Sequence, residues 1–261
     1  MIDHRADCSA IRDQGSCGSC TSFGTCGAWE CNLRKKGVNT DLSERDIFSC
    51  SGGVCSRGLT MNAILNGAMV GTSIEKCCPY DASDHNCGEG RCANYTIFTR
   101  KIKSFKRITD TNEMKQYLNT QALVGVMAVY QSFMNYVSGV YETLPNDTLL
   151  GYHCIAVVGY DDEKGAWLIR NSWGTGWGMS GYCWIKYGTS MINEEMFVLE
   201  LDDNPQPDPD VEPTPSEPTP SPCNHGKAWA KIFNFVPWLL HRRGRFYYMN
   251  PNKKNKCGCN K

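Results

Sequence analysis

The sequence has little of what marks a membrane protein or a zinc protein. No stretch approaches the roughly 18 apolar residues of a membrane-spanning helix, and no basic-then-apolar signal sequence follows Met1. Histidine is scarce, with five residues in 261, and no pair of Cys-x-x-Cys knuckles stands at the spacing of a zinc finger. We therefore expect no membrane span, no metal site and no other cofactor.

Cysteine, by contrast, is abundant, with 16 residues. With zinc set aside, such usage predicts disulfides and an oxidising compartment, either extracellular or lysosomal/vacuolar. Two sequons, Asn94-Tyr-Thr and Asn146-Asp-Thr, are compatible with export. A signal sequence and a pro-segment would then lie upstream of Met1.

The formal net charge of +0 hides three segments of different composition. Residues 1–201 have mixed charge and are long enough for a conventional domain, which we expect to be monomeric and not to bind nucleic acid. Residues 202–222 are acidic and proline-rich, which predicts an extended linker. Residues 223–261 form a basic, aromatic tail with three cysteines and no predicted fold. The tail is either an unstructured extension or a surface for an anionic polysaccharide, a nucleic acid or a membrane.

Helical patterns dominate the first half of the domain and strand patterns the second. Apolar periodicity predicts helices over 20–36, from 43, over 61–70 and over 111–119, with disulfide-stapled loops over 72–95. Short β-branched or aromatic runs predict strands over 123–130, 155–160, 166–170, 182–187 and 196–201. A helical half followed by an antiparallel half indicates an α+β fold of two lobes that meet at a cleft.

Three separated residues form a candidate catalytic set. Cys20 opens the first predicted helix, where the helix dipole and the unpaired N–H groups favour a thiolate. His153 precedes a predicted buried strand, and Asn171 follows the next one. If the strands are antiparallel neighbours, the Asn171 amide oxygen can accept one ring N–H of His153 and leave the other nitrogen aimed at Cys20. Trp173 would cover that hydrogen bond, and an imidazolium–thiolate pair could form. A lone buried Cys or His usually has a structural role. The occurrence of Cys20, His153 and Asn171 together, in this order and spacing, favours a catalytic role.

The runs Gln14–Cys20, His153–Tyr160 and Asn171–Gly178 resemble, in order and in spacing, the signatures of papain-like cysteine peptidases of the papain and cathepsin type. The resemblance covers about residues 2–201, and the run from Ile11 to Gly15 is most similar to cathepsin B. It implies a helical lobe over about 13–105, an antiparallel β-barrel lobe over about 106–201 and an active site in the cleft between them.

The resemblance also implies a reaction. Cys20 would form a thioester acyl-enzyme with a polypeptide substrate, with His153 as general acid and base. The side chain of Gln14 and the backbone N–H of Cys20 would stabilise the oxyanion. Cathepsin B trims dipeptides with a loop that bears two adjacent histidines, and here His85 stands alone, so an endopeptidase is favoured over a dipeptidyl exopeptidase. A catalytically impaired binding protein, or an acyl transferase that uses the same acylation chemistry, remains an alternative.

Two positions depart from the family pattern. Thr21 stands where the family has Trp, which either loosens the start of the helix or alters the pKa of the nucleophile. The family's Gly-Cys-x-Gly-Gly cleft motif is Val54-Cys-Ser-Arg-Gly58. Gly58 is retained for contact with the substrate backbone, whereas Arg57 either places a charge at the cleft or points into solvent.

The specificity pocket is expected from residues near Gly58, Val126, Tyr152 and the last strand. Leu199 and Glu200 point to opposite faces of that strand because side chains alternate. Leu199 in the pocket would select bulky apolar residues two positions before the cut, whereas Glu200 would accept Arg. We favour Leu199.

The resemblance further implies a disulfide between Cys17 and Cys55 and a second from Cys50 to Cys87 or Cys92. Apart from Cys20, an even number of cysteines falls within residues 1–201, which is consistent with six bridges.

Overall fold

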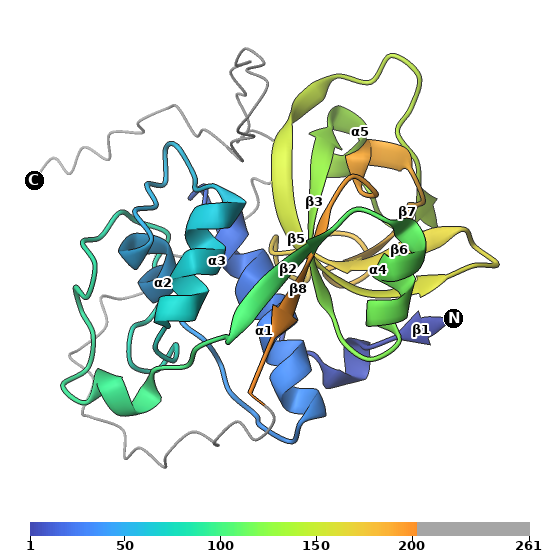
Figure 1. The fold of residues 1–261 in the computed structure, drawn as a ribbon. Helices are drawn as coiled ribbons and strands as arrows, with labels where there is room; N and C mark the ends of the chain where they lie inside the picture. Colours follow the sequence, from blue (N-terminus) through green and yellow to red (C-terminus); the bar gives the residue numbers. More distant parts are fainter. Residues whose placement is uncertain (203–261) are drawn as a thin grey trace, which may run out of the picture.

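The computed structural model describes residues 1–202. Helices α1, α2 and α3 lie on one side of the molecule, and the strands lie on the other together with α4 and α5 (Figure 1), which makes an α+β fold. The predicted linker after residue 202 and the predicted tail over 223–261 lie outside the described residues. Within residues 1–202, no helix is both long enough and apolar enough to cross a membrane.

The helical side contains three α-helices, of which α1 is central. Ser43 begins α2 by accepting the backbone N–H of Asp46 (3.0 Å), and Thr60 begins α3 by accepting that of Ala63 (3.3 Å), as N-cap residues do. Helix α1 is buried from Cys20 to Leu33, so it runs through the interior instead of along a surface. The helices of this side are α1 (Cys20–Lys35), α2 (Glu44–Cys50) and α3 (Met61–Val70), with 3-10 turns at Arg5–Asp7 and Tyr95–Phe98.

The strands form one sheet in the order β2-β8-β3-β5-β6-β7-β4, and β1 pairs with β5. All pairs are antiparallel except β4 with β7. The strands are β1 (Ile2–Asp3), β2 (Ser104–Ile108), β3 (Leu123–Tyr130), β4 (Val140–Tyr141), β5 (Leu149–Asp161), β6 (Ala166–Arg170), β7 (Tyr182–Lys186) and β8 (Met196–Glu200). The helices of this side are α4 (Thr111–Leu118) and α5 (Gln131–Met134), with a 3-10 turn at Thr189–Met191.

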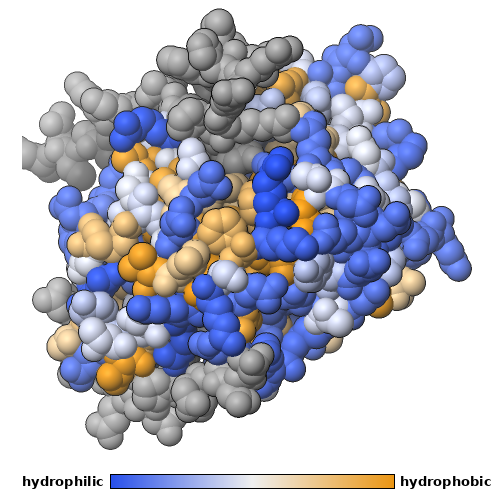
Figure 2. Space-filling view, viewed as in Figure 1, coloured by the Kyte–Doolittle hydropathy of each residue, from blue (hydrophilic) through white to orange (hydrophobic). Residues whose placement is uncertain are grey.

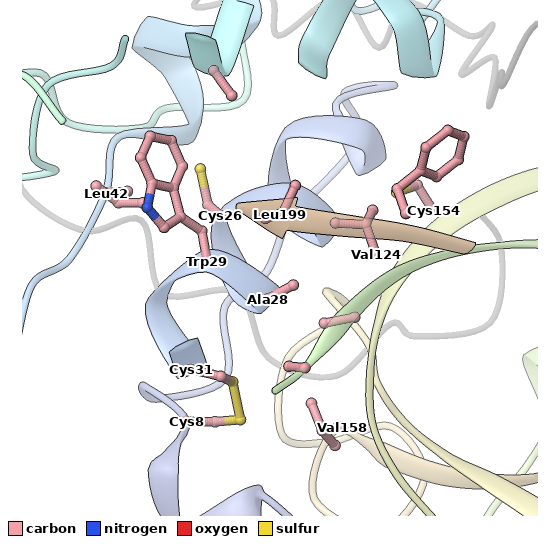
Figure 3. Close-up of a cluster of buried hydrophobic side chains, with 14 of the residues drawn as sticks. Cys8, Cys26, Ala28, Trp29, Cys31, Leu42, Val124, Cys154, Val158 and Leu199 are labelled. Carbon is pink, nitrogen blue, oxygen red and sulfur yellow. A yellow bond between two sulfur atoms is a disulfide. The ribbon is translucent and has the colours of Figure 1, made fainter. Parts of the chain in front are cut away.

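The alternation of side chains along β5 separates two hydrophobic cores. Ile155 and Val157 belong to the core that the sheet encloses with α4 and α5. Cys154, Ala156 and Val158 belong to the core shared with α1, part of which Figure 3 draws. Viewed from outside, hydrophobic side chains gather at the middle of one face between the two sides of the molecule (Figure 2). The α1–β5 contact therefore joins the two lobes.

The predicted elements are largely confirmed, with one consequential difference. The strands β3 and β6 have the predicted ends, and Asp110 caps α4 through the N–H of Glu113 (2.8 Å). Strand β5 begins at Leu149 instead of 155, because the register with β3 continues through Met127 and His153. His153 therefore lies inside a strand and not at its mouth.

The disulfide prediction was partly wrong. The structure confirms Cys17–Cys55, and Cys50 pairs with Cys87, not with Cys92. The six-bridge expectation fails, since residues 1–202 hold four bridges, the other two being Cys8–Cys31 and Cys77–Cys92. The thiols left free are Cys26, Cys78, Cys154 and Cys183, besides Cys20, and all are buried. They pack as small apolar side chains, so an even count did not imply pairing.

Candidate active site

The loop before α1 is fixed by close backbone contacts. The disulfide Cys17–Cys55 and the hydrogen bond from the Gly18 N–H to the Cys55 carbonyl (2.9 Å) hold it against residues 55–58. A Cβ on Gly18 would lie 2.8 Å from that carbonyl oxygen and 3.2 Å from the Cα of Gly58, so only glycine fits. Gly58 is itself buried and has a φ of 68°. The predicted cleft glycine thus lies beside the loop that presents Cys20.

His153, the predicted base, and Asn171, the residue predicted to orient it, meet where neighbouring strands pair. His153 on β5 and Asn171 after β6 form a hydrogen bond of 2.8 Å between Nε2 and Oδ1. Trp173 stacks on the imidazole with ring centroids 4.9 Å apart, which covers this bond. The other ring nitrogen, Nδ1, has no hydrogen-bond partner in the described part of the chain. It is therefore available to take a proton.

Gln14 is held in the loop at two points. Its Nε2 donates to the Cys17 carbonyl (2.9 Å), and its Oε1 accepts from the Ser172 hydroxyl (2.7 Å). The backbone N–H of Gln14 also donates to the Ser172 carbonyl (2.9 Å). An amide group has two N–H donors, so one is left for a substrate oxygen. The position suits the predicted oxyanion donor.

Burial opposes the imidazolium–thiolate pair that the sequence predicts. Desolvation raises the pKa of the Cys20 thiol to about 11, against the smaller opposite effect of the N–H groups of Cys154, Thr21 and Cys20 itself. Desolvation also lowers the pKa of His153 to about 4, although the bond to Asn171 favours protonation. No hydrogen bond joins Cys20 to His153 among residues 1–202. In this geometry burial shifts the pKa values of both groups toward their neutral forms.

The two departures from the family pattern have different settings. Thr21 is buried, and its hydroxyl has no hydrogen-bond partner among the described residues. Arg57 is exposed, as expected for a side chain that points into solvent. Neither one removes a reacting group.

The candidate pocket residues divide by burial. Val126 and Leu199 are 5% and 1% exposed and belong to the core on the α1 side of the sheet. Tyr152 is half-buried and packs against the same core. Glu200 is exposed. Figure 3 shows Leu199 on β8 between α1 and Val124 of β3.

Two glycines inside α1 permit its close approach to the sheet, a feature that sequence reasoning missed. A Cβ on Gly24 would lie 2.5 Å from the Cys154 sulfur, and one on Gly27 would lie 2.7 Å from Nη1 of Arg170. The guanidinium of Arg170 donates to the Ser9 hydroxyl (2.9 Å), so it too is fixed in place. Glycine inside a helix lowers stability by about 1 kcal/mol relative to alanine. Two glycines inside one predicted helix were therefore the available sign of a close contact there.

Within residues 1–202 no group of three or more His, Cys, Asp or Glu side chains is arranged to hold a metal ion. The chemistry that the site offers is that of a thiol, an imidazole, an amide that orients the imidazole, and two N–H donors. Such a set suits acyl transfer from a carbonyl compound to the thiol.

The sequence is similar to those of known cysteine proteases. The family model described as papain family cysteine protease matches residues 1–199. Cathepsin L of Sarcophaga peregrina is 37% identical over 200 residues, which cover 71% of this chain and 57% of that protein. Cysteine proteinase 1 of Entamoeba histolytica is 37% identical over 187 residues, with 66% and 58% covered. The chain thus spans less than two thirds of these relatives.

Solved structures agree on the fold. A cysteine protease of Carica candamarcensis in complex with E-64 has a TM-score of 0.66 at 26% identity, with 77% of this chain and 98% of that chain covered. Bromelain from Ananas comosus in complex with the E64 inhibitor has a TM-score of 0.65 at 22% identity, with the same shares covered.

Proposed function

The chain belongs to the papain family of cysteine proteases, and we propose that it hydrolyses internal peptide bonds of polypeptides through a thioester at Cys20. The observation that carries the proposal is the bond from His153 Nε2 to Asn171 Oδ1 (2.8 Å), which leaves Nδ1 without a partner. The residue after His153 directs its backbone N–H at the Cys20 thiol. A proton acceptor and a nucleophile thus flank one site.

The proposed reaction has two halves, acylation of Cys20 and hydrolysis of the thioester, and His153 moves protons in both. The Cys20 sulfur attacks the carbonyl carbon while its proton passes to His153 Nδ1, and the carbonyl electron pair moves to oxygen. The Cys20 N–H and the free N–H of Gln14 stabilise that oxyanion. Its collapse breaks the C–N bond, and the amine leaves with the proton from His153. Water then attacks the thioester, gives a proton to His153 and releases the acid as the thiol is restored.

The burial of Cys20 and His153 bears on the order of proton movement. Moving the thiol proton to the imidazole creates two opposite charges without changing the net charge of the site. Burial disfavours both charges. We infer that transfer accompanies attack, because the oxyanion donors and the neighbouring N–H groups then stabilise the negative charge as it moves from sulfur to oxygen.

We also propose a preference for bulky apolar residues two positions before the cut. The buried positions of Val126 and Leu199 support an apolar pocket wall, and the exposure of Glu200 gives no support to a buried carboxylate that would pair with Arg. A substrate series with Leu, Phe and Arg at that position tests this. Faster cleavage after Arg than after Leu or Phe would contradict it.

Endopeptidase activity is favoured over trimming of dipeptides. No two histidines are adjacent in the sequence, and relatives named cathepsin L are among the matches. A quenched peptide blocked at both ends should be cleaved internally. Release of C-terminal dipeptides alone, from unblocked peptides, would favour the exopeptidase alternative.

We propose an extracellular or lysosomal/vacuolar site of action, which the cysteine chemistry supports. Four disulfides need an oxidising compartment to form. Detection of the same bridges as free thiols in protein isolated under alkylating conditions would contradict this proposal.

The decisive test of activity compares two cysteine variants. Cys20→Ala should abolish hydrolysis of a fluorogenic peptide. Cys183→Ala is the matched control, since Cys183 is also a free, fully buried thiol but lies in the core inside the sheet. Retained hydrolysis in the Cys20 variant, or equal loss in both variants, would refute the assignment.

A further inference from the structure

Tyr80 is a half-buried tyrosine whose hydroxyl touches the two segments that carry the oxyanion donors. Its Oη donates to the backbone carbonyl of Gln14 (2.8 Å) and lies 2.6 Å from the hydroxyl of Ser19. A phenol has one hydrogen, and Gln14 receives it, so the Ser19 hydroxyl must be the donor of the second bond. The ring of Tyr80 meets that of Phe23 edge-on, with centroids 4.7 Å apart. Sequence reasoning placed Tyr80 in a loop and gave it no role.

The bond to Tyr80 changes what Ser19 does at the start of α1. Serine at an N-cap ordinarily accepts a backbone N–H from the first turn of its helix. Ser19 is the N-cap of α1 and makes no such bond. With its hydroxyl turned to Tyr80, Ser19 leaves the first-turn N–H groups of α1, that of Cys20 among them, uncapped by a side chain.

The segment that carries Tyr80 is anchored independently of the active site. The Tyr80 N–H donates to Oε1 of Glu75 (3.0 Å), and Arg45 donates to the Pro79 carbonyl (3.0 Å). The disulfide Cys77–Cys92 closes the same segment. The hydroxyl of Tyr80 is thus presented from a fixed base, as a support for a preorganised site should be.

We propose that Tyr80 is a positioning residue for the oxyanion hole. It fixes the backbone of Gln14, whose side chain is one oxyanion donor. It also fixes Ser19, which precedes Cys20, and the backbone N–H of Cys20 is the other donor. The inference rests on the proposed peptidase function and adds a residue that touches neither the substrate nor the reacting atoms.

Tyr80→Phe keeps the ring on Phe23 and removes both hydrogen bonds. Loss of an oxyanion donor costs about 10²–10³ in kcat, and a displacement of about 1 Å costs about 10², so a loosened donor pair should lower kcat by about 10- to 100-fold. KM should stay within about 2-fold, because the oxyanion forms only as the bond reacts. The matched control is Tyr160→Phe: Tyr160 is half-buried too, and its hydroxyl donates to Asn119 (2.9 Å) on the far side of the sheet.

The test separates oxyanion stabilisation from general integrity with two probes. A peptide aldehyde forms a hemithioacetal whose oxygen occupies the oxyanion hole, whereas alkylation by iodoacetamide builds no such oxygen. We expect the aldehyde affinity of Tyr80→Phe to fall with kcat, and its alkylation rate at Cys20 to stay within about 2-fold of the unmodified protein. Equal falls in both, or no fall in kcat, would overturn the role of Tyr80.

Ser19→Ala provides a second variant that does not remove the phenol. It should lower kcat in the same direction by a smaller factor, and the double variant should be no worse than Tyr80→Phe within about 2-fold, because both act through one bond. If the kcat loss of the double variant instead equalled the product of the two single-variant losses, the proposal would be contradicted. Absence of hydrolysis and aldehyde binding in the unmodified protein would overturn the proposed function and this role with it. If the unmodified protein hydrolyses peptides normally and Tyr80→Phe has the same kcat, only the role of Tyr80 is overturned.

Discussion

Adding a methyl group at Gly24 tests whether the α1–β5 contact holds the site together. The Cβ of Gly24→Ala would lie 2.5 Å from the Cys154 sulfur and 3.0 Å from the backbone nitrogen of Ile155. Ordinary contacts between such atoms are about 3.5–4 Å, so about 1 Å must be gained by separating helix and strand. Overpacking of this kind costs about 1–3 kcal/mol. Alanine in place of a helical glycine returns about 1 kcal/mol. We therefore expect a net loss of stability of about 1 kcal/mol.

The loss of activity should be larger than the loss of stability suggests. Cys20 lies one turn before Gly24 on α1, and His153 directly precedes Cys154 on β5, so the same separation moves nucleophile and base apart. A misplacement of about 1 Å lowers kcat/KM by about 10²-fold. Urea unfolding and peptide hydrolysis, measured on the same preparation, give both quantities.

The double variant with Cys154→Ala completes the argument. It removes the sulfur that makes the closest contact, so it should recover part of both losses, and the recovery measures the coupling between the two positions. Cys154→Ala alone is the control for the space that the sulfur leaves. A Gly24→Ala protein that is more stable than the unmodified one and fully active would refute the close contact of Gly24 with Cys154.

Three further outcomes are expected. Burial raises the pKa of the Glu30 carboxyl to about 7, above the value of 4.5 for an exposed one, so the stability that its protonated form contributes is present below about pH 4.5 and is lost as the pH rises through 7. Urea unfolding should show this loss between about pH 4.5 and 8 in the unmodified protein and not in Glu30→Gln, and a rise in stability would contradict this. Asn171→Ala should lower kcat/KM by about 10²-fold in peptide hydrolysis, since it orients the base, and a loss as complete as that of Cys20→Ala would contradict the division of roles. Mass mapping of an unreduced digest should join Cys50 to Cys87, and a link from Cys50 to any other cysteine would show the pairing to be wrong.

Much of the fold and the pairing of His153 with Asn171 could be predicted because they leave local patterns. Apolar runs and alternation predicted both ends of β3 and β6, and helical periodicity predicted the starts of α3 and α4. Cys20, His153 and Asn171 were predicted from residue types whose chemistry is rare in combination. Antiparallel pairing then sufficed to bring His153 to Asn171.

The features that escaped prediction depend on contacts between distant segments. Cys50 pairs with Cys87 and leaves Cys92 to Cys77, a choice that chain geometry makes and cysteine spacing does not. The extent of β5 depends on its pairing with β3. Gly24 is explained only by the residue across the interface, and a loop tyrosine such as Tyr80 shows no periodicity to reveal its role.

The resting protonation state also could not be predicted from local sequence. The start of a helix favours a thiolate, and on that basis an ion pair was expected at Cys20. The full burial of Cys20 and His153 outweighs the nearby N–H groups and shifts both pKa values toward the neutral forms. Burial is a property of the folded molecule, so the sign of the net effect became visible only in the structure.

Whether Cys20 is the nucleophile is tested most directly by intact mass. The protein, in a mildly acidic reducing buffer, is treated with an epoxysuccinyl inhibitor such as E-64 and then weighed by mass spectrometry. We expect one adduct, mapped to Cys20, with the other buried thiols, those of Cys26, Cys78, Cys154 and Cys183, unmodified. No adduct on a demonstrably folded sample, or an adduct at any other cysteine, would contradict the claim that Cys20 is the nucleophile of a working peptidase site.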